Sequence, residues 1–341
     1  MRSSQLSLAA LFPILILATA GTSAAASTGQ ERAVAAGAPL IGRPAPALAI
    51  KTIDGERIDL GSVYGKKAVY LKFWATWCVP CREQMPHFER TFENAGTDLL
   101  VLAVDTGFNE SKDDVIAYRR QMGLKMPIAI DDGRFAAAFN LRVTPQHVVI
   151  GRDGRVAYVG NLVDQHLEDA LSAARRAPTA ALATTVAAAP AIRYAVGSRA
   201  ADLKLVTIDG QSVSAVDAVR HRPLAIVFLS PWCESYFAQS RPARAGACAS
   251  ARTQVEALAT DSGMRWVGIA SGLWATREDV VEYRDKYKIA YPIVLDESGS
   301  LFRAFDVISV PVVIVLDAEG QVRQRVEHVD KDLRAALAAS R

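Results

Sequence analysis

The sequence predicts an α/β protein with two tandem copies of one domain, each built on a mixed central sheet flanked by helices. Apolar runs of strand length alternate with segments of helical spacing, as in sheets with helical crossovers. A two-residue Asp153-Gly154 turn predicts a hairpin on the same sheet, which makes the sheet mixed. The pattern then returns, and 341 residues, of which 50% are hydrophobic, are enough for two cores.

The elements of the first copy follow in order along the chain. We expect strands over 69–74, 99–105, 128–131, 146–150 and 156–159. We expect helices from Cys78 to about Ala95 and over 113–122, 134–139 and 164–175.

The second copy is recognised by identical residues at a nearly constant offset. Residues 42–81 align with 197–236 at an offset of 155, and Thr52-Ile53-Asp54-Gly55 returns as Thr207-Ile208-Asp209-Gly210. Further along, the offset is 165 and then 166, where Pro145 returns as Pro311. A repeat of this length is a duplicated domain. We therefore expect domains over 40–176 and 193–341, joined by an uncharged Ala/Thr/Pro linker over 177–192.

Residues 1–26 have the features of a secretory signal peptide. Arg2 lies in a short polar start, fifteen apolar residues follow over 6–20, and Ala24-Ala25-Ala26 supplies small residues before a mature start at Ser27. The apolar run is shorter than the ~20 residues that a membrane span needs. We expect an exported chain that is soluble after cleavage, with an uncleaved N-terminal membrane anchor as the alternative. Disulfides persist outside the cytosol.

Charge and motifs exclude several classes of partner. A net charge of +3 gives no argument for nucleic acid. The five histidines are scattered, without a paired helical motif, so no metal site is expected. Residues 61–67 fall short of a phosphate loop and there is no dinucleotide fingerprint, so we expect no nucleotide cofactor. Electrons must then arrive through another protein's thiols.

The chemistry is predicted at Cys78 and Cys81, which follow a buried strand and open a helix. A helix N-terminus stabilises a thiolate, so Cys78 is the candidate nucleophile and Cys81 the resolving thiol. The intervening Val79-Pro80 would help to set the reduction potential. A zinc site would need four ligands, and an inert disulfide is the other weak alternative. We expect a redox-active disulfide and no other cofactor.

Residues 40–176 resemble the thioredoxin-like family of exported thiol–disulfide oxidoreductases, in its TlpA/ResA-like branch. The matching segments are Gly42-Arg43-Pro44-Ala45-Pro46, Thr52-Ile53-Asp54-Gly55, Phe73-Trp74-Ala75-Thr76-Trp77-Cys78-Val79-Pro80-Cys81-Arg82-Glu83 and Val143-Thr144-Pro145. The resemblance implies a cis Pro145 that faces the cysteine pair, with the backbone before it binding substrate main chain. A plain turn at Pro145 is the alternative.

This resemblance also implies where substrates bind and where the protein works. The predicted substrate-binding residues are Trp77, Val79, Pro80, Thr144 and Pro145, with Trp77 the aromatic residue expected to be exposed. The family implies a bacterial periplasm, protein thiol or disulfide substrates, and a reducing role supplied by a membrane thiol electron donor. An N-terminally anchored protein would face the same compartment.

Lys72 departs from the pattern of thioredoxins. They carry a buried acid six residues before the first cysteine, and this sequence has Lys72 there. A buried lysine is costly unless it is paired. Lys72 therefore either reaches solvent or lies near the thiols, where it would favour a thiolate. We favour the first of these.

In the second copy Tyr236 stands where Cys81 stands, which excludes a two-thiol exchange at that loop. Cys248, in a segment about ten residues longer, is the other thiol available to Cys233. We expect these two to form a structural disulfide, which an exported protein favours. A redox-active pair exchanging with the first domain, and a lone peroxide-reacting Cys233, are the alternatives.

The function we predict is thiol–disulfide exchange by Cys78 and Cys81, reducing or isomerising disulfides of periplasmic proteins. One alternative is a thiol peroxidase that uses Cys233, although the proline expected seven residues earlier is Ile226. The other is a non-catalytic binding protein with structural disulfides, against which an accessible Cys78 would argue. Substrate identity and oligomeric state are not encoded in any pattern we find.

Overall fold

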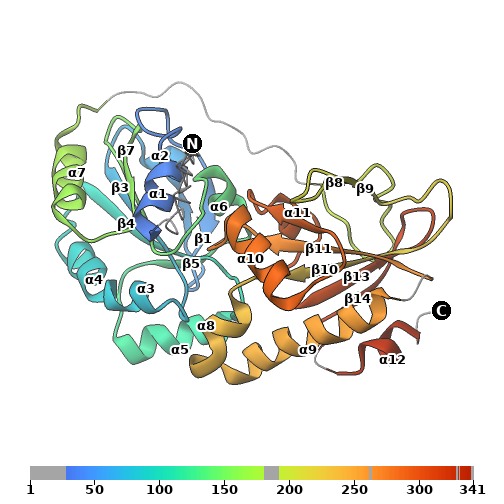
Figure 1. Ribbon diagram of the computed structural model, residues 1–341. Coiled ribbons are helices and arrows are strands. Elements are labelled where there is room, and N and C mark those ends of the chain that lie inside the picture. Colours follow the sequence, from blue (N-terminus) through green and yellow to red (C-terminus); the bar gives the residue numbers. More distant parts are fainter. Residues whose placement is uncertain (1–27, 180–191, 261–262, 328, 330, 339–341) are drawn as a thin grey trace, which may run out of the picture.

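The computed structural model describes residues 28–179, 192–260, 263–327, 329 and 331–338. Two lobes lie side by side, the first in blue to green and the second in yellow to red (Figure 1). Each holds a five-stranded mixed sheet, as predicted. The predicted signal peptide, and most of the predicted linker, lie outside the described residues.

In the first lobe the strand order is β5-β4-β3-β6-β7. The strands are β3 (Ala68–Trp74), β4 (Leu99–Asp105), β5 (Ile128–Ile130), β6 (Gln146–Ile150) and β7 (Val156–Gly160). β3, β4 and β5 run parallel, whereas β6 and β7 pair antiparallel. All seven residues of β3 are buried, because the strand is central and covered on both faces.

Helices cover the two faces of this sheet. They are α2 (Leu60–Val63), α3 (Val79–Glu83), α4 (Met85–Glu93), α5 (Lys112–Met122), α6 (Arg134–Ala138) and α7 (Gln165–Arg176), with α1 (Gly29–Gly37) packed against β7. Our prediction of a single helix from Cys78 to about Ala95 is wrong, because this segment forms two helices, α3 and α4. Pro86 lies in the first turn of α4, where a missing N–H is tolerated, and so it starts a new helix.

The second lobe repeats this arrangement with the order β12-β11-β10-β13-β14. Its strands are β10 (Leu224–Leu229), β11 (Arg265–Ser271), β12 (Ile293–Asp296), β13 (Val312–Leu316) and β14 (Val322–Val326). Its helices are α8 (Cys233–Ser240), α9 (Pro242–Ala259), α10 (Arg277–Tyr287), α11 (Ser300–Ala304) and α12 (Leu333–Ala338). Even the irregularities match, because the last hairpin is bulged at Val149/Ile150 and again at Val315/Leu316.

Each lobe also has a short hairpin that we did not predict. One pairs β1 (Ala49–Lys51) with β2 (Arg57–Asp59), and the other pairs β8 (Lys204–Val206) with β9 (Ser212–Ser214). Three-residue strands are too short to show a period of two in a sequence. The repeated Thr-Ile-Asp-Gly segments follow β1 and β8 directly, so they mark the turns.

The same local chemistry starts the equivalent helices of the two lobes. Ser111 and Asp114 form a reciprocal capping box at α5, and Thr276 and Asp279 form one at α10. The hydrophobic core consists of three clusters, of which one is continuous across both lobes. Within the described residues, no helix combines the length and the apolar character needed to cross a membrane.

Candidate active site

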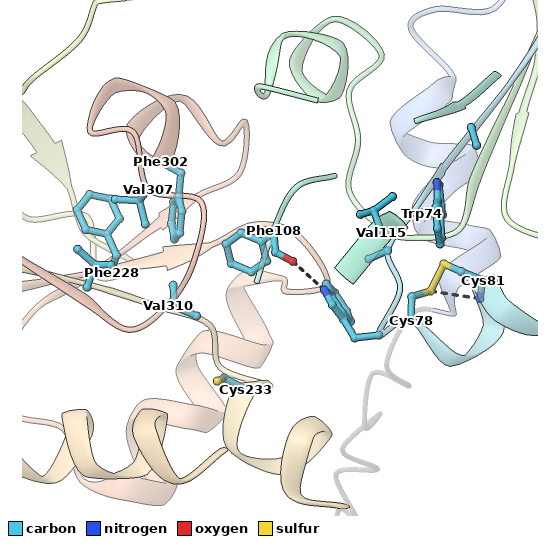
Figure 2. Packing of buried hydrophobic residues seen from close by; sticks show 14 of the residues in the cluster. Trp74, Cys78, Cys81, Phe108, Val115, Phe228, Cys233, Phe302, Val307 and Val310 are labelled. Atoms are coloured by element: carbon cyan, nitrogen blue, oxygen red, sulfur yellow. Dashed lines mark hydrogen bonds between the residues drawn. A yellow bond between two sulfur atoms is a disulfide. The ribbon is translucent and has the colours of Figure 1, made fainter. Parts of the chain in front are cut away.

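The first pair of cysteines lies where the central strand β3 ends. Cys78 caps α3, and its Sγ accepts the N–H of Cys81 at 3.2 Å (Figure 2). A disulfide joins the two residues, whose Cα atoms are 5.2 Å apart. After reduction, this N–H would stabilise negative charge on the Cys78 sulfur. The geometry therefore suits Cys78 as the attacking sulfur and Cys81 as the sulfur one turn further into the helix.

Four of the five predicted substrate-binding residues differ in how far they are exposed. Val79 is half exposed and Pro80 is partly buried, whereas Thr144 and Pro145 are buried. The Thr144–Pro145 peptide bond is cis, and so is Val310–Pro311 in the second lobe. Asn161 donates a hydrogen bond to the Pro145 carbonyl, which fixes the backbone on the far side of the proline.

Our expectation that Lys72 reaches solvent is wrong. Its side chain is completely buried, Nζ donates to the Cys81 carbonyl at 3.3 Å, and the ammonium lies 5.7 Å from the centre of the Phe88 ring. Among the described residues, no carboxylate forms an ion pair with it. Desolvation by burial lowers the pKa of Lys72 to about 7. The residue is therefore a buried amine beside Cys81, the predicted resolving cysteine.

A hydrogen-bonded chain of three side chains is centred on His147, which pairs with Lys72 on the neighbouring strand β6. His147 Nδ1 is 2.8 Å from the Tyr70 hydroxyl, and Nε2 is 2.8 Å from Oε1 of Gln84. Burial, and then the charge of Lys72, hold the pKa of His147 well below its ordinary value. A neutral His147 adds no second positive charge next to Lys72.

Two carboxyls lie near the loop before Cys78, the partly buried Glu110 and the fully buried Asp105, and sequence reasoning missed both. Glu110 accepts the Thr76 N–H at 3.0 Å and also the Thr76 hydroxyl. Burial, reinforced by the neighbouring Glu110, raises the pKa of Asp105 well above its ordinary value. The equivalent residues of the second lobe are Ala270 and Ala275, so these two carboxyls are present only in the lobe that holds Cys78 and Cys81. No spacing rule links these carboxyls to the cysteines.

The second pair of cysteines is also bonded. A disulfide joins Cys233 at the start of α8 to Cys248 in α9, and both residues are buried. The protein has no free cysteine, so Cys233 offers no thiol to a peroxide in this arrangement. The bond ties α8 to α9, which follow the central strand of the second lobe as α3 and α4 follow that of the first.

The expectation that Trp77 is exposed at the site is also wrong, because the second lobe covers it. The indole of Trp77 stacks on that of Trp232, with ring centres 5.3 Å apart. Tyr236 accepts the Val79 N–H at 3.1 Å and donates to the Trp77 carbonyl at 3.4 Å. Cys78 is fully buried, so the accessible thiol that would have argued against a binding protein is absent in this arrangement.

Figure 2 shows how the two lobes meet. Phe108 lies between the Cys78–Cys81 pair on one side and Phe302, Phe228 and Val310 of the second lobe on the other. The Phe108 and Phe302 rings are 6.0 Å apart, and the Phe108 carbonyl accepts the Trp77 indole N–H at 2.7 Å. Among the described residues, no group of three or more His, Cys, Asp or Glu is placed to hold a metal ion.

Comparison with known proteins relates both lobes to thioredoxin-like families. The AhpC/TSA family matches residues 41–159, and the Redoxin family matches residues 189–339. The thioredoxin-like protein YneN of Bacillus subtilis (strain 168) is 35% identical over 133 residues, which cover 38% of this chain and 78% of that protein. The thiol-disulfide oxidoreductase ResA of Bacillus thuringiensis (strain Al Hakam) is 31% identical over 134 residues, which cover 38% and 75%.

Solved structures that resemble the chain include a thiol:disulfide interchange protein of the thioredoxin family from Chlorobium tepidum TLS. It is 26% identical, with a TM-score of 0.35, and the match covers 39% of this chain and 95% of that one.

Proposed function

Since the chain belongs to the ResA-like family of thioredoxin-fold thiol–disulfide oxidoreductases, we propose that Cys78 and Cys81 exchange electrons with disulfides of protein substrates. The observation that carries this proposal is the Cys78–Cys81 disulfide at the start of α3, where the Cys81 N–H points at the Cys78 sulfur. Such a helix start favours a reactive thiolate rather than an inert bond.

The exchange has two steps. In the reduced protein, the Cys78 thiolate attacks a substrate disulfide, so that a Cys78–substrate bond forms and the second substrate sulfur leaves as a thiolate. Cys81, once deprotonated, attacks the Cys78 sulfur, the Cys78–Cys81 bond forms and the remaining substrate sulfur leaves. The protein loses two electrons and the substrate gains two.

The direction, compartment and electron donor are part of the same proposal. A reducing role requires a donor that returns two electrons to the Cys78–Cys81 disulfide, and we assign this to a membrane protein thiol pair. Residues 1–26 support export to the periplasm, by cleavage or as an N-terminal anchor. We assign substrate contacts to Trp77, Val79, Pro80, Thr144 and Pro145.

A redox titration of the full chain in glutathione buffers tests the proposal. After each equilibration, alkylation and mass mapping report the state of all four cysteines. We expect Cys78 and Cys81 to titrate together between about −120 and −270 mV, the range of thioredoxin-fold oxidoreductases. A potential below about −300 mV is typical of structural disulfides and would refute an exchange role.

Reduction of a protein disulfide is the second test of the proposed function. The Cys78→Ser substitution is expected to abolish this reduction, because no sulfur remains at position 78 to bond to the substrate. Cys233→Ser is the matched control, since it removes one cysteine at the equivalent position of the other lobe and should leave the reduction rate within about twofold. Reduction that persists in Cys78→Ser contradicts the proposal.

A further inference from the structure

The two lobes meet face to face with pseudo-two-fold symmetry. The Asn109 N–H donates to the Ile308 carbonyl at 2.8 Å, and the Trp274 N–H donates to the Arg142 carbonyl at 2.9 Å. Asn109 and Trp274 are 165 residues apart, and Arg142 and Ile308 are 166 apart, which are the offsets of the internal repeat. Each lobe therefore gives the other the same backbone hydrogen bond from the same turn.

A second pair of contacts reaches the residues that precede the two cis-prolines. The Oδ1 of Asn109 accepts the Val310 N–H at 2.9 Å, and the Trp274 indole donates to the Thr144 hydroxyl at 3.0 Å. Thr144 precedes Pro145 and Val310 precedes Pro311. The second lobe thus contacts Thr144, one of the residues to which the proposed function assigns substrate, and the first lobe makes the equivalent contact with Val310.

The contact at Trp274 is made by a strained backbone. Its φ is +64°, in the left-handed region, which is a genuine outlier for a bulky side chain. Asn109, at the equivalent turn with φ of +59°, is a residue type that tolerates this region. A conformation that costs energy persists where surrounding contacts hold it, and here those contacts are the first lobe's Arg142 and Thr144.

The second lobe covers the Trp77–Val79 loop through residues in and next to α8, the helix that follows its central strand. Trp232 stacks on Trp77, and Tyr236, at the position of Cys81, bonds both the Val79 N–H and the Trp77 carbonyl. Arg241 adds bonds to the Asn109 carbonyl at 2.8 Å and to the Thr76 hydroxyl at 3.0 Å. The substitution that ends dithiol chemistry in the second lobe thus supplies a contact to the first.

The geometry points to the second lobe as a substrate-like occupant of the first lobe's predicted substrate-binding surface at Trp77, Val79 and Thr144, which a protein substrate displaces to reach Cys78. This inference rests on the proposed function. The groups that the occupant supplies describe the partner that can replace it. They are a backbone N–H for the Arg142 carbonyl, a donor for Thr144, and an aromatic ring for Trp77. A polypeptide segment with an aromatic residue beside its disulfide has this chemistry.

Alkylation of Cys78 in the reduced full chain tests the occupancy without requiring catalysis. Tyr236→Phe removes the hydroxyl, and Trp274→Asn keeps a turn residue that accepts positive φ while it removes the indole. Each lost hydrogen bond should shift the closed–open equilibrium about fivefold. Tyr236 makes two of these bonds and the Trp274 indole makes one, so the double variant should react with a maleimide-polyethylene glycol about 125-fold faster at Cys78 than wild type. Tyr194→Phe, in a tyrosine that packs on Phe305 within the second lobe, is the matched control and should be unchanged.

Equal alkylation rates in wild type, control and double variant would overturn the occupancy. Circular dichroism confirms that each variant is folded, and the Tyr236→Phe single variant provides an independent reading should the double variant fail to fold. If the double variant is alkylated faster yet neither chain reduces any disulfide, the proposed function fails and the occupancy stands.

A pair of peptide disulfides tests the likeness to substrate. The two peptides differ only in having Trp or Ala beside the disulfide, and reduction by the wild-type chain is measured as kcat/KM. We expect at least a fivefold preference for the Trp peptide, because only its ring can replace Trp232 on Trp77. Equal values for the two peptides would refute the aromatic class of partner while leaving the alkylation result unaffected.

Discussion

Lys72 should destabilise the folded protein at neutral pH. Burial lowers its pKa from 10.5 to about 7. At 1.36 kcal/mol per pKa unit, protonating the buried amine costs about 5 kcal/mol of folding free energy at pH values below 7. The hydrogen bond to Cys81 and the Phe88 ring offset part of this, by about 1–2 kcal/mol. Lys72→Met, which keeps the volume and removes the charge, should therefore stabilise the protein by about 3 kcal/mol at pH 7.

The sign of the pH dependence follows from the lowered pKa. Between pH 7 and 10.5 the unfolded chain binds the Lys72 proton and the folded chain does not, so wild-type stability rises with pH through this window. The Met variant lacks this group. The stability difference between the two proteins should be largest below pH 7 and should shrink steadily to pH 10, while other titrations cancel in the comparison.

Urea unfolding of the disulfide-bonded protein at several pH values from 6 to 10 measures this difference. Lys51→Met is the control, since it makes the same substitution at an exposed residue of β1 and should not reproduce the effect of Lys72→Met. A Lys72→Met variant that is less stable than wild type, or a stability difference that does not vary with pH, would refute the reasoning.

Three other predictions follow from the site. Cys81→Ser should stop the exchange after the first step, so the Cys78–substrate mixed disulfide should accumulate in non-reducing mass spectra; its absence would contradict the role of Cys81 as resolving thiol. Replacing Cys233 and Cys248 with Ser should lower the unfolding free energy by about 3 kcal/mol, the chain-entropy value for a loop of their 15-residue separation, and leave the Cys78–Cys81 potential unchanged. A shifted potential would instead indicate a redox relay. Burial raises the pKa of Asp131 from 3.8 to about 6. Because the folded chain then keeps a proton that the unfolded chain has lost, the wild type should lose up to about 3 kcal/mol of unfolding free energy relative to Asp131→Asn as pH rises from about 4 to 6. A stability difference between the two proteins that stays constant in urea unfolding across this window would contradict the expectation.

Local pattern was sufficient for most of the sheet and for the cysteine pair. The apolar runs that became β3 and β4 were predicted to within one residue, because a central parallel strand is buried on both faces and shows no polar interruption. Cys78 and Cys81 could be assigned because a strand, a helix start and a three-residue spacing occur together. The β1–β2 hairpin has no such signal in its three-residue strands.

The errors at Lys72 and Trp77 have a different cause. Charge alone predicted an exposed Lys72, and only the packing of α3 and α4 on β3 shows that its amine is enclosed. Trp77 is covered by Trp232, which is 155 residues away in the sequence. Contacts between two folded lobes depend on how the lobes dock, and no periodicity within either lobe encodes that docking.

The second lobe keeps those parts of a redox domain that the contact with the first lobe uses. Trp232, the turn at Trp274 and the backbone before Pro311 all take part in the contact, and each has its counterpart in the first lobe at Trp77, Asn109 and Thr144. The second lobe lacks a cysteine at the position of Cys81. Tyr236 stands there instead, and its hydroxyl accepts the Val79 N–H of the first lobe. A lobe that only stabilised the first would not need equivalent residues of the two lobes to contact each other. The arrangement is therefore better explained by a second lobe that occupies the first lobe's predicted substrate-binding surface than by one that only stabilises the fold.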